Sequence, residues 1–425
     1  MRKDFHRKGL LLLAALGTVA SIAACSEKLE AGRSCPLLCP EQAISLRDTV
    51  IDAVLTDTTV LGLPPIGSES YLMLASHGDT AETRVIVRYD TLPQQYTKSG
   101  IDSAIVNIDS ATLITPIVKP DSTNRPRGPV TIEAYDVDTT ATDTVSSILG
   151  SLFRPDRFLG SRTFLPESLL DTLRIPISTD SVLAAVKNAT PFRVGLRLVT
   201  AAGYDIRIGS TQVSNPVTLR IKASKDTAAT PVMVTPVSRT PADKPFLAGP
   251  LADYTIVLRG LTGQPPALLS VGGLPSRRTF IHFDVPSHIV DSTTIVRASL
   301  LLTQVPNRRL DQSDSIYVYP LAVLASPAVT DVATLLEFLG TNGQFGMDSL
   351  KLVPADSGAR SFEIVGLVRT WRGQATTVVP RSIALRSGAE GQLPGQIDFF
   401  STKGPASLRP RIRITYVPQT SYGLP

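Results

Sequence analysis

The stretch SRRTFIHFDVP, residues 276–286, places His282 and Asp284 two positions apart, on one face of an expected strand. A histidine beside a carboxylate is the arrangement of a general base and the group that orients it. The stretch has an internal counterpart, RVIVRYD at residues 84–90, in which Arg88 stands at the position of His282. Because the role of a base depends on imidazole itself, this replacement favours an exposed strand position. An Asp at a strand end accepts local backbone hydrogen bonds, so Asp284 is interpreted as a turn-forming residue.

Other patterns that carry chemistry give no support for an enzyme. The sequence has no Gly-x-Ser-x-Gly, His-Glu-x-x-His or phosphate-binding loop. The acidic fragments DVD (136–138) and DQSD (311–314) lack the Gly and the distal Glu of a calcium loop. Paired carboxylates of a glycosidase meet only in space, so the sequence neither excludes nor supports them. We therefore expect no catalysis, no cofactor and no metal centre.

The elements that would position these residues repeat along the chain. RVIVRYD matches RTFIHFD at residues 278–284, TIEAY (131–135) matches SIYVY (315–319), and PFRVGLRL (191–198) matches PRSIALRS (380–387). Because the matches occur in the same order, they indicate a duplicated domain. Each copy consists of short runs that alternate apolar and polar residues, rich in Val, Ile and Thr and separated by Pro, Gly, Asp and Ser. Alternation is typical of antiparallel sheets with one buried and one solvated face.

These patterns predict an all-β protein with two tandem antiparallel β-sandwich domains, jelly-roll-like in architecture. Helical periodicity is brief, at TVSSILGSL (144–152) and VTDVATLLEFLG (329–340), where we expect short helices or turns. The expected organisation is a signal peptide at 1–24, a lipidated cysteine and tether at 25–43, a first sandwich at 44–224, a Pro-rich linker at 225–245, a second sandwich at 246–418 and a tail at 419–425.

The N-terminus indicates export. Arg2, Lys3, Arg7 and Lys8 precede the apolar run LLLLAALGTVASIAA, which is too short for a membrane span and leads directly to Cys25. The segment IAAC resembles the lipobox of bacterial lipoproteins, which implies cleavage before Cys25 and its acylation with fatty acid such as palmitate. Ser26 stands where the family's inner-membrane retention signal has Asp, so the resemblance implies the outer membrane, facing the periplasm or the cell surface. In an oxidising compartment, Cys35 and Cys39 of CPLLC favour a local disulfide over a metal site, because two thiolates are too few ligands.

Charge limits the classes of partner. Removing residues 1–24 takes away four basic residues and one acidic residue and leaves 38 Lys and Arg against 36 Asp and Glu, a net charge of +2. The mature chain therefore has no basic field that would attract nucleic acid. Residues 246–418 hold 16 basic and 12 acidic residues, and 14 of the basic residues are Arg. The candidate ligands for an anionic glycan or lipid headgroup are Arg277, Arg278, Arg308, Arg309, Arg411 and Arg413; the alternative is an ordinary solvated polar face.

Aromatic residues leave two interpretations open. Tyr317 and Tyr319 in SIYVYP point to one strand face, so they either support a sugar ring or fill the sandwich. Trp371 is the only tryptophan, and Val182 stands at its place in the first copy, which favours a core position.

The second copy resembles the DNRLRE-type β-sandwich domain of secreted bacterial proteins. The resemblance rests on LLSVGGLPSRRTFIHFDVP, IVRASLLLTQV, IVGLVRTWRG and, above all, IDFFSTKGPASLRPRIRITY. It covers nearly all of residues 250–417, but the Asn-Tyr-Gly and paired-Trp segments of that family are missing. Since some relatives bind acidic polysaccharide and others are surface repeats, the resemblance implies an exported module. We expect a non-catalytic, lipid-anchored binding or adhesion module for polysaccharide; the alternative is a structural or assembly subunit that binds envelope proteins.

Overall fold

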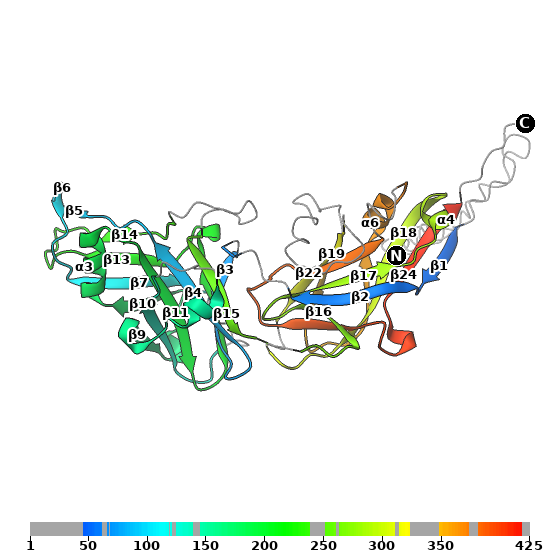
Figure 1. Cartoon of the computed structure of the whole chain (residues 1–425), viewed down its shortest axis with the longest axis horizontal. Helices are drawn as coiled ribbons and strands as arrows, with labels where there is room; N and C mark the ends of the chain where they lie inside the picture. Colours follow the sequence, from blue (N-terminus) through cyan, green and yellow to red (C-terminus); the bar gives the residue numbers. More distant parts are fainter. Residues whose placement is uncertain are drawn as a thin grey trace, which may run out of the picture. The chain divides into compact units, whose positions relative to one another are not determined.

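The computed structural model describes residues 46–61, 66–67, 69–118, 120, 125–138, 145–238, 251–260, 263–310, 314–323, 348–373 and 381–418. Contacts divide the chain into residues 1–46 and 47–425, and all the sheets belong to the second unit. The described residues of this unit are mostly strand, in antiparallel sheets that form sandwich-like domains (Figure 1). The predicted β class is therefore confirmed. The predicted signal peptide and tether, with Cys25, Cys35 and Cys39, lie outside the described residues.

The first sandwich, drawn from blue through cyan to green in Figure 1, contains a seven-stranded and a four-stranded sheet. Its strands are β3 (Tyr71–Ser76), β4 (Glu82–Tyr89), β7 (Ser110–Pro116), β8 (Val130–Asp136), β9 (Phe158–Phe164), β10 (Thr172–Ile177), β11 (Phe192–Thr200), β12 (Tyr204–Gly209), β13 (Thr218–Lys222), β14 (Val232–Val234) and β15 (Asp253–Arg259). The larger sheet runs β12-β3-β4-β11-β8-β9 with β15 beside β4, and the smaller runs β10-β7-β13-β14. A separate hairpin joins β5 (Gln95–Lys98) to β6 (Ile101–Ala104).

Alternation along β4 explains how this sandwich is held. Val85 and Val87 are fully buried against the core shared with the smaller sheet. Ile86 points to the other side of β4 and packs with Tyr254 of β15 in a second apolar cluster. Both faces of β4 are thus covered, and each fully buried apolar side chain contributes roughly 1.5–3 kcal/mol.

The second sandwich is built from one eleven-stranded sheet that follows the path β1-β24-β18-β23-β16-β17-β22-β19-β20, with β2 beside β17 and β21 beside β18. These strands are β1 (Arg47–Ile51), β2 (Val54–Leu61), β16 (Leu268–Gly272), β17 (Arg277–Phe283), β18 (Thr293–Val305), β19 (Ile316–Ala322), β20 (Leu350–Leu352), β21 (Gly358–Glu363), β22 (Ser382–Ser387), β23 (Gln396–Phe400) and β24 (Arg411–Pro418). A core that includes Phe283, Phe362 and Phe399 lies inside it. Trp371 is 1% exposed in the same core, so its predicted core position is confirmed.

Helices are short and close the ends of strands. They are α2 (Ser146–Gly150), α3 (Thr179–Asn188), α4 (Ser287–Val290) and α6 (Val365–Thr370), with single 3₁₀ turns η1 (Pro155–Arg157), η2 (Pro166–Ser168), η3 (Thr211–Val213) and η4 (Ala406–Leu408). In α3, the Ser178 side chain caps the first turn by accepting a hydrogen bond from the Ser181 N–H, and Ala189 ends the helix in a left-handed conformation. The helix expected within 144–152 is α2; the one expected within 329–340 lies outside the described residues.

Strand pairing repeats between the sandwiches. The order β12-β3-β4-β11-β8-β9 has its counterpart in β23-β16-β17-β22-β19-β20, and β10-β7-β13-β14 has its counterpart in β21-β18-β24-β1. The counterpart of β15 on β4 is β2 on β17. The sequence repeats therefore correspond to repeated topology, with β4 equivalent to β17.

The pairing does not follow the predicted boundaries of 44–224 and 246–418. Strands β1 and β2, blue in Figure 1, pair with β24 and β17 of the second sandwich. Strand β15, which follows the predicted linker, pairs with β4 of the first sandwich. The linker range itself contains β14, which pairs with β13. A strand joins whichever sheet offers a free edge, and that choice is not written in its local pattern.

Candidate binding surface

His282 and Asp284 do not form a base and carboxylate pair. His282 is half-buried on β17, opposite Thr56 of β2, and burial lowers its pKa despite the opposing effect of Asp284. Asp284 lies beyond the strand end with an exposed side chain, and its backbone N–H donates to the carbonyl of Ala53 at 2.8 Å. Within the described residues, no hydrogen bond joins the two side chains. The arrangement is that of a strand residue followed by a strand-ending one.

Arg277 and Arg278 were expected to present their guanidinium groups to an anionic ligand, but they are 3% and 1% exposed, so the expected exposure is wrong. Arg278 donates from Nε and Nη2 to the two carboxylate oxygens of Glu390, at 2.7 and 2.6 Å. Arg277 donates to the side-chain oxygen of Gln396 beside Asp398. Neighbouring residues of a strand point to opposite faces, so each arginine enters a different buried layer. Both guanidinium groups serve the interior of the fold.

The four other predicted arginines lie at the surface. Arg308 and Arg309 are exposed beyond β18, while Arg411 and Arg413 share the outer face of β24, as their spacing predicts. Arg413 is already occupied, because its Nη2 lies 2.6 Å from Asp48 of β1. Solvent screens an exposed pair of this kind, so it adds little to stability. Burial lowers the pKa of Arg277, and the nearby charge of Arg309 adds to the effect, so these two of the six predicted arginines lie near each other.

Tyr317 and Tyr319 lie on the outer face of β19, and Tyr317 is 48% exposed. The alternative in which this pair fills the sandwich is wrong, because the intervening Val318 takes the buried position. Register places Lys351 of β20 directly opposite Tyr317 and Arg386 of β22 directly opposite Tyr319. Residues directly opposite one another share a face of the sheet. We call Tyr317, Tyr319, Lys351 and Arg386 the tyrosine face.

The cations of the tyrosine face have no acidic partner within the described part of the chain. Lys351 is exposed, and the half-buried Arg386 has an Nε without a hydrogen-bond partner. The ring of Tyr319 rests against Gly388, where an added Cβ would lie 2.7 Å from the ring carbon Cε2. Glycine at this position therefore lets the ring lie against the backbone of the neighbouring strand. Flat aromatic rings beside unpaired cations suit the ring and the carboxylate or sulfate group of an anionic sugar.

At the corresponding position of the first sandwich, an acidic side chain pairs with the arginine. Glu133 of β8 lies opposite Arg197 of β11 as Tyr319 lies opposite Arg386, so Glu133 is the structural counterpart of Tyr319. The sequence match that aligns Tyr135 with Tyr319 is thus shifted by two residues. Arg197 Nη1 lies 3.8 Å from Glu133 Oε2, and the Tyr135 hydroxyl donates to the same carboxylate at 2.9 Å.

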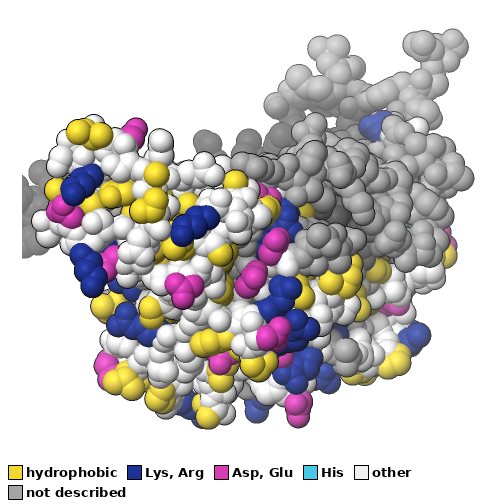
Figure 2. Space-filling model, turned by 60° about the vertical axis from the view of Figure 1, so that its left-hand side comes forward, with side chains coloured by type: hydrophobic (Ala, Val, Ile, Leu, Met, Phe, Trp, Pro, Cys, Tyr) yellow, Lys and Arg dark blue, Asp and Glu magenta, His cyan; other side chains and the backbone are white. Residues whose placement is uncertain are grey.

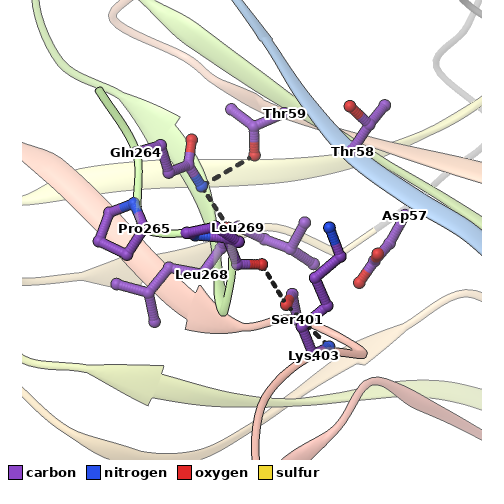
Figure 3. Close-up of a pocket in the computed structure, with 10 residues that line it drawn as sticks. Asp57, Thr58, Thr59, Gln264, Pro265, Leu268, Leu269, Ser401 and Lys403 are labelled. Atoms are coloured by element: carbon purple, nitrogen blue, oxygen red, sulfur yellow. Dashed lines mark hydrogen bonds between the residues drawn. The ribbon is translucent and has the colours of Figure 1, made fainter. Parts of the chain in front are cut away.

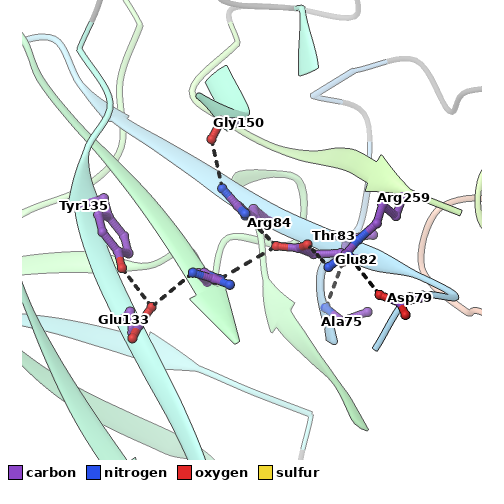
Figure 4. Close-up of polar contacts among 10 residues, drawn as sticks. Ala75, Asp79, Glu82, Thr83, Arg84, Glu133, Tyr135, Gly150 and Arg259 are labelled. Atoms are coloured by element: carbon purple, nitrogen blue, oxygen red, sulfur yellow. Dashed lines mark hydrogen bonds and ion pairs between the residues drawn. The ribbon is translucent and has the colours of Figure 1, made fainter. Parts of the chain in front are cut away.

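Glu82 extends this closed network of the first sandwich, shown in Figure 4. It accepts hydrogen bonds from Arg84 Nη2 at 2.6 Å and from Arg259 Nη2 at 2.5 Å. Burial opposes the ionisation of Glu82, but these arginines hold its pKa below the usual value. Both arginines are therefore paired with an acid, unlike Arg386 of the second sandwich.

A small pocket of about 190 Å³ opens beside β2 and β16 (Figure 3). Its polar groups already bind one another: Gln264 Nε2 donates to Thr59 Oγ1 at 3.1 Å and to the Leu268 carbonyl. Asp57 accepts from the backbone N–H and the hydroxyl of Thr402, at 2.6 and 2.8 Å. These hydrogen bonds hold β2 in place, and they leave few polar groups of the pocket free to bind a ligand.

One face of the described surface is mixed in charge. On the face seen in Figure 2, Lys and Arg side chains are interspersed with Asp and Glu. Among the described residues, no group of three or more His, Cys, Asp or Glu is placed to hold a metal ion. In the same residues, no helix has the length and apolar character needed to cross a membrane.

Comparisons with known proteins identify no relative. No protein-family model and no curated protein matches the chain. Among solved structures, the infectious bursal disease virus Gt strain is 10% identical, covering 90% of this chain and 78% of that chain with a TM-score of 0.14. The Macrobrachium rosenbergii nodavirus is 8% identical, covering 89% of this chain and 91% of that chain with a TM-score of 0.17. Scores this low carry no inference about fold or function.

Sequence reasoning named both tyrosines but missed Lys351, Arg386 and Gly388. Alternation in SIALRSG, residues 382–388, places Arg386 and Gly388 on one face. The sequence does not show that this strand, β22, pairs with β19, and only the register of that pairing brings Arg386 opposite Tyr319.

Proposed function

We propose that this protein is a non-catalytic, lipid-anchored protein of the bacterial cell envelope that binds an anionic polysaccharide through the tyrosine face. In this proposal Cys25 carries the acyl chains, the outer membrane is the anchoring membrane, and Cys35 and Cys39 form a local disulfide. The sandwiches are jelly-roll-like, and the second is akin to the DNRLRE-type domain.

The observation that carries the proposal is the contrast between equivalent sheet positions. Arg197 of the first sandwich faces the carboxylate of Glu133, whereas Arg386 of the second faces the ring of Tyr319. A cation without a fixed acid can accept an anion from solution, and an adjacent ring can stack on a sugar. The face is formed by neighbouring strands, which hold the four side chains at defined spacing.

Binding of the mature chain to an array of neutral, uronate-containing and sulfated glycans, in low and high salt, tests the proposal. We expect binding of acidic glycans that weakens as salt screens the charges. Arg386→Gln should weaken binding about tenfold, which corresponds to about 1.4 kcal/mol. Tyr319→Ala should weaken binding in both salts, because stacking does not depend on ionic strength.

Arg372→Gln is the matched control, since Arg372 is an exposed arginine of the same sandwich outside the tyrosine face. It removes the same charge and should leave the affinity unchanged. Equal losses in Arg372→Gln and Arg386→Gln would reduce the effect to net charge, and no acidic glycan bound in either salt would refute the proposal.

The second candidate function is a structural or assembly subunit that binds envelope proteins. It is favoured by apolar side chains that point into solvent from β1 and β2: Val50, Leu55 and Leu61 are 49%, 57% and 55% exposed. Apolar side chains exposed on neighbouring segments are candidate contacts for a protein partner. Co-purification from detergent-solubilised envelopes of wild-type protein, compared with Leu55→Ser, distinguishes it: a partner lost only in Leu55→Ser would favour assembly, and identical partner sets would exclude it.

A further inference from the structure

The two repeats exchange their leading strands. Along the chain, β1 and β2 precede the body of the first repeat, and β14 and β15 precede the body of the second. Yet β2 pairs with β17 along its whole length and β1 with β24, while β15 pairs with β4 and β14 with β13. Each leading pair therefore completes the sandwich of the other repeat.

Equivalent side chains hold both exchanged strands. Asp57 of β2 accepts from the backbone N–H and hydroxyl of Thr402, at 2.6 and 2.8 Å. Asp253 of β15 accepts from the backbone N–H and hydroxyl of Thr211, at 2.8 and 2.6 Å.

A second equivalent contact lies two residues further along each strand. Thr59 Oγ1 accepts from the Ser270 N–H at 3.0 Å, and Thr255 Oγ1 accepts from the Met73 N–H at 3.0 Å. The same contacts recur for β2 and β15. Pairing of each strand with its sheet therefore depends on these local contacts and not on whether strand and sheet are adjacent in the chain.

The two leading pairs differ in how firmly they are held. The first four residues of β15 are buried, and Tyr254 and Ile256 are 0% and 2% exposed. No residue of β2 is fully buried, and Leu55 and Leu61 are exposed. Strand β2 is thus held by backbone hydrogen bonds, a few polar contacts and the partly buried side chains of Val54 and Val60, without a fully buried anchor. Segments with little buried apolar surface open locally at a free energy well below that of global unfolding.

Opening of β2 would leave an unsatisfied sheet edge. One edge of β17 pairs with β22. Along the opposite edge, β16 pairs at a single position, Gly272 with Arg277, so the rest of that edge depends on β2. A bare edge presents unpaired N–H and C=O groups that recruit another strand. The strand whose side chains match this edge is β2 itself, and every copy of the chain carries one.

We propose that the edges of β17 and β24 form an acceptor slot for the β1–β2 segment of a second copy of this chain. Reciprocal exchange of residues 47–61 closes a two-fold dimer in which the β1–β24 and β2–β17 pairings of the monomer are kept. The segment of the same chain competes at an effective concentration on the order of millimolar. Exchange therefore requires concentrated protein or conditions that open β2.

Cysteine cross-linking across chains tests the exchange. In full-length chains whose Cys25, Cys35 and Cys39 are replaced by Ser, one variant carries Thr56→Cys and another carries His282→Cys. These positions lie directly opposite each other in the β2–β17 register, and neither side chain is fully buried. The two variants are mixed at high concentration in mild urea, dialysed and oxidised.

The expected result is a disulfide-linked heterodimer of the two variants. A mixture of Thr56→Cys with Thr131→Cys, which lies on β8 away from the slot, measures random collision. Heterodimer at the level of that control would overturn the proposal. The Thr56→Cys/His282→Cys double variant, oxidised while dilute, locks β2 onto its own chain and should stay monomeric in light scattering after the same treatment. Dimerisation of the locked variant equal to that of wild type would likewise overturn strand exchange.

Discussion

Glu69 is a carboxyl group whose burial makes stability depend on pH. Its side chain lies in a residue that is 3% exposed, next to β3 in the first sandwich. Its Oε2 accepts from the Gly67 N–H at 2.8 Å, while Oε1 is buried without a hydrogen-bond partner. Burial raises the pKa of Glu69 from 4.5 to about 7, and the nearby carboxylate of Asp253 adds to the rise.

The sign and size of the effect follow from linkage. The folded state holds this proton more tightly than the unfolded state, so the stabilisation is complete below pH 4.5 and is lost as pH rises to about 7. One pKa unit corresponds to 1.36 kcal/mol, so ionised Glu69 lowers the free energy of unfolding by about 3 kcal/mol above pH 7. Glu69→Gln keeps an acceptor for the Gly67 N–H and removes the titration. The variant should gain about 3 kcal/mol over wild type at pH 8 relative to pH 4.5.

Urea unfolding followed by far-ultraviolet circular dichroism, at steps from pH 4.5 to pH 8, measures the difference. Glu167→Gln is the matched control, because Glu167 is exposed in η2. The control should follow the wild-type curve within about 0.5 kcal/mol. If Glu69→Gln keeps the wild-type pH dependence, the carboxyl group is solvated or paired, and the reasoning from burial is refuted.

Three further variants probe other parts of the molecule. Arg278→Ala leaves the carboxylate of Glu390, whose side chain is 9% exposed, without its partner and should lower the free energy of unfolding by about 3–5 kcal/mol in the same urea assay. Gly388→Ala adds a Cβ 2.7 Å from the Tyr319 ring, so the ring must move and acidic-glycan affinity should fall about tenfold on the array. Cys25→Ser should abolish incorporation of labelled palmitate and release the protein from the membrane fraction. The control for stability is Arg372→Ala, at an exposed arginine, and the control for binding is Gly128→Ala, where an added Cβ meets no atom within 4 Å. The control for lipidation is Cys35→Ser with Cys39→Ser. Each control should leave the measured property unchanged, and equal effects in variant and control would contradict the assignment.

Local pattern in the sequence predicted the strands and the repeat because both are local properties. Alternation in RTFIHF and SIYVY requires a strand with two distinct faces, and Trp371 could be placed in the core because its counterpart is Val182. Which face of β19 meets solvent was not predictable, since both faces carry bulky side chains. The burial of Arg278 was missed because its partner, Glu390, lies more than a hundred residues away in the sequence.

The exchange of leading strands escaped prediction for a related reason. Strands β2 and β15 are equivalent in contacts, with Asp57 matching Asp253 and Thr59 matching Thr255, so each fits either body by local chemistry. Connectivity alone favours the nearer body, yet the observed pairing links each leading strand to the other repeat. A chain cut within 225–245 would therefore take β15 from the first sandwich and β2 from the second. The unit that must fold together is the pair of repeats, and domain limits drawn from sequence similarity divide it at a point that the hydrogen bonding crosses.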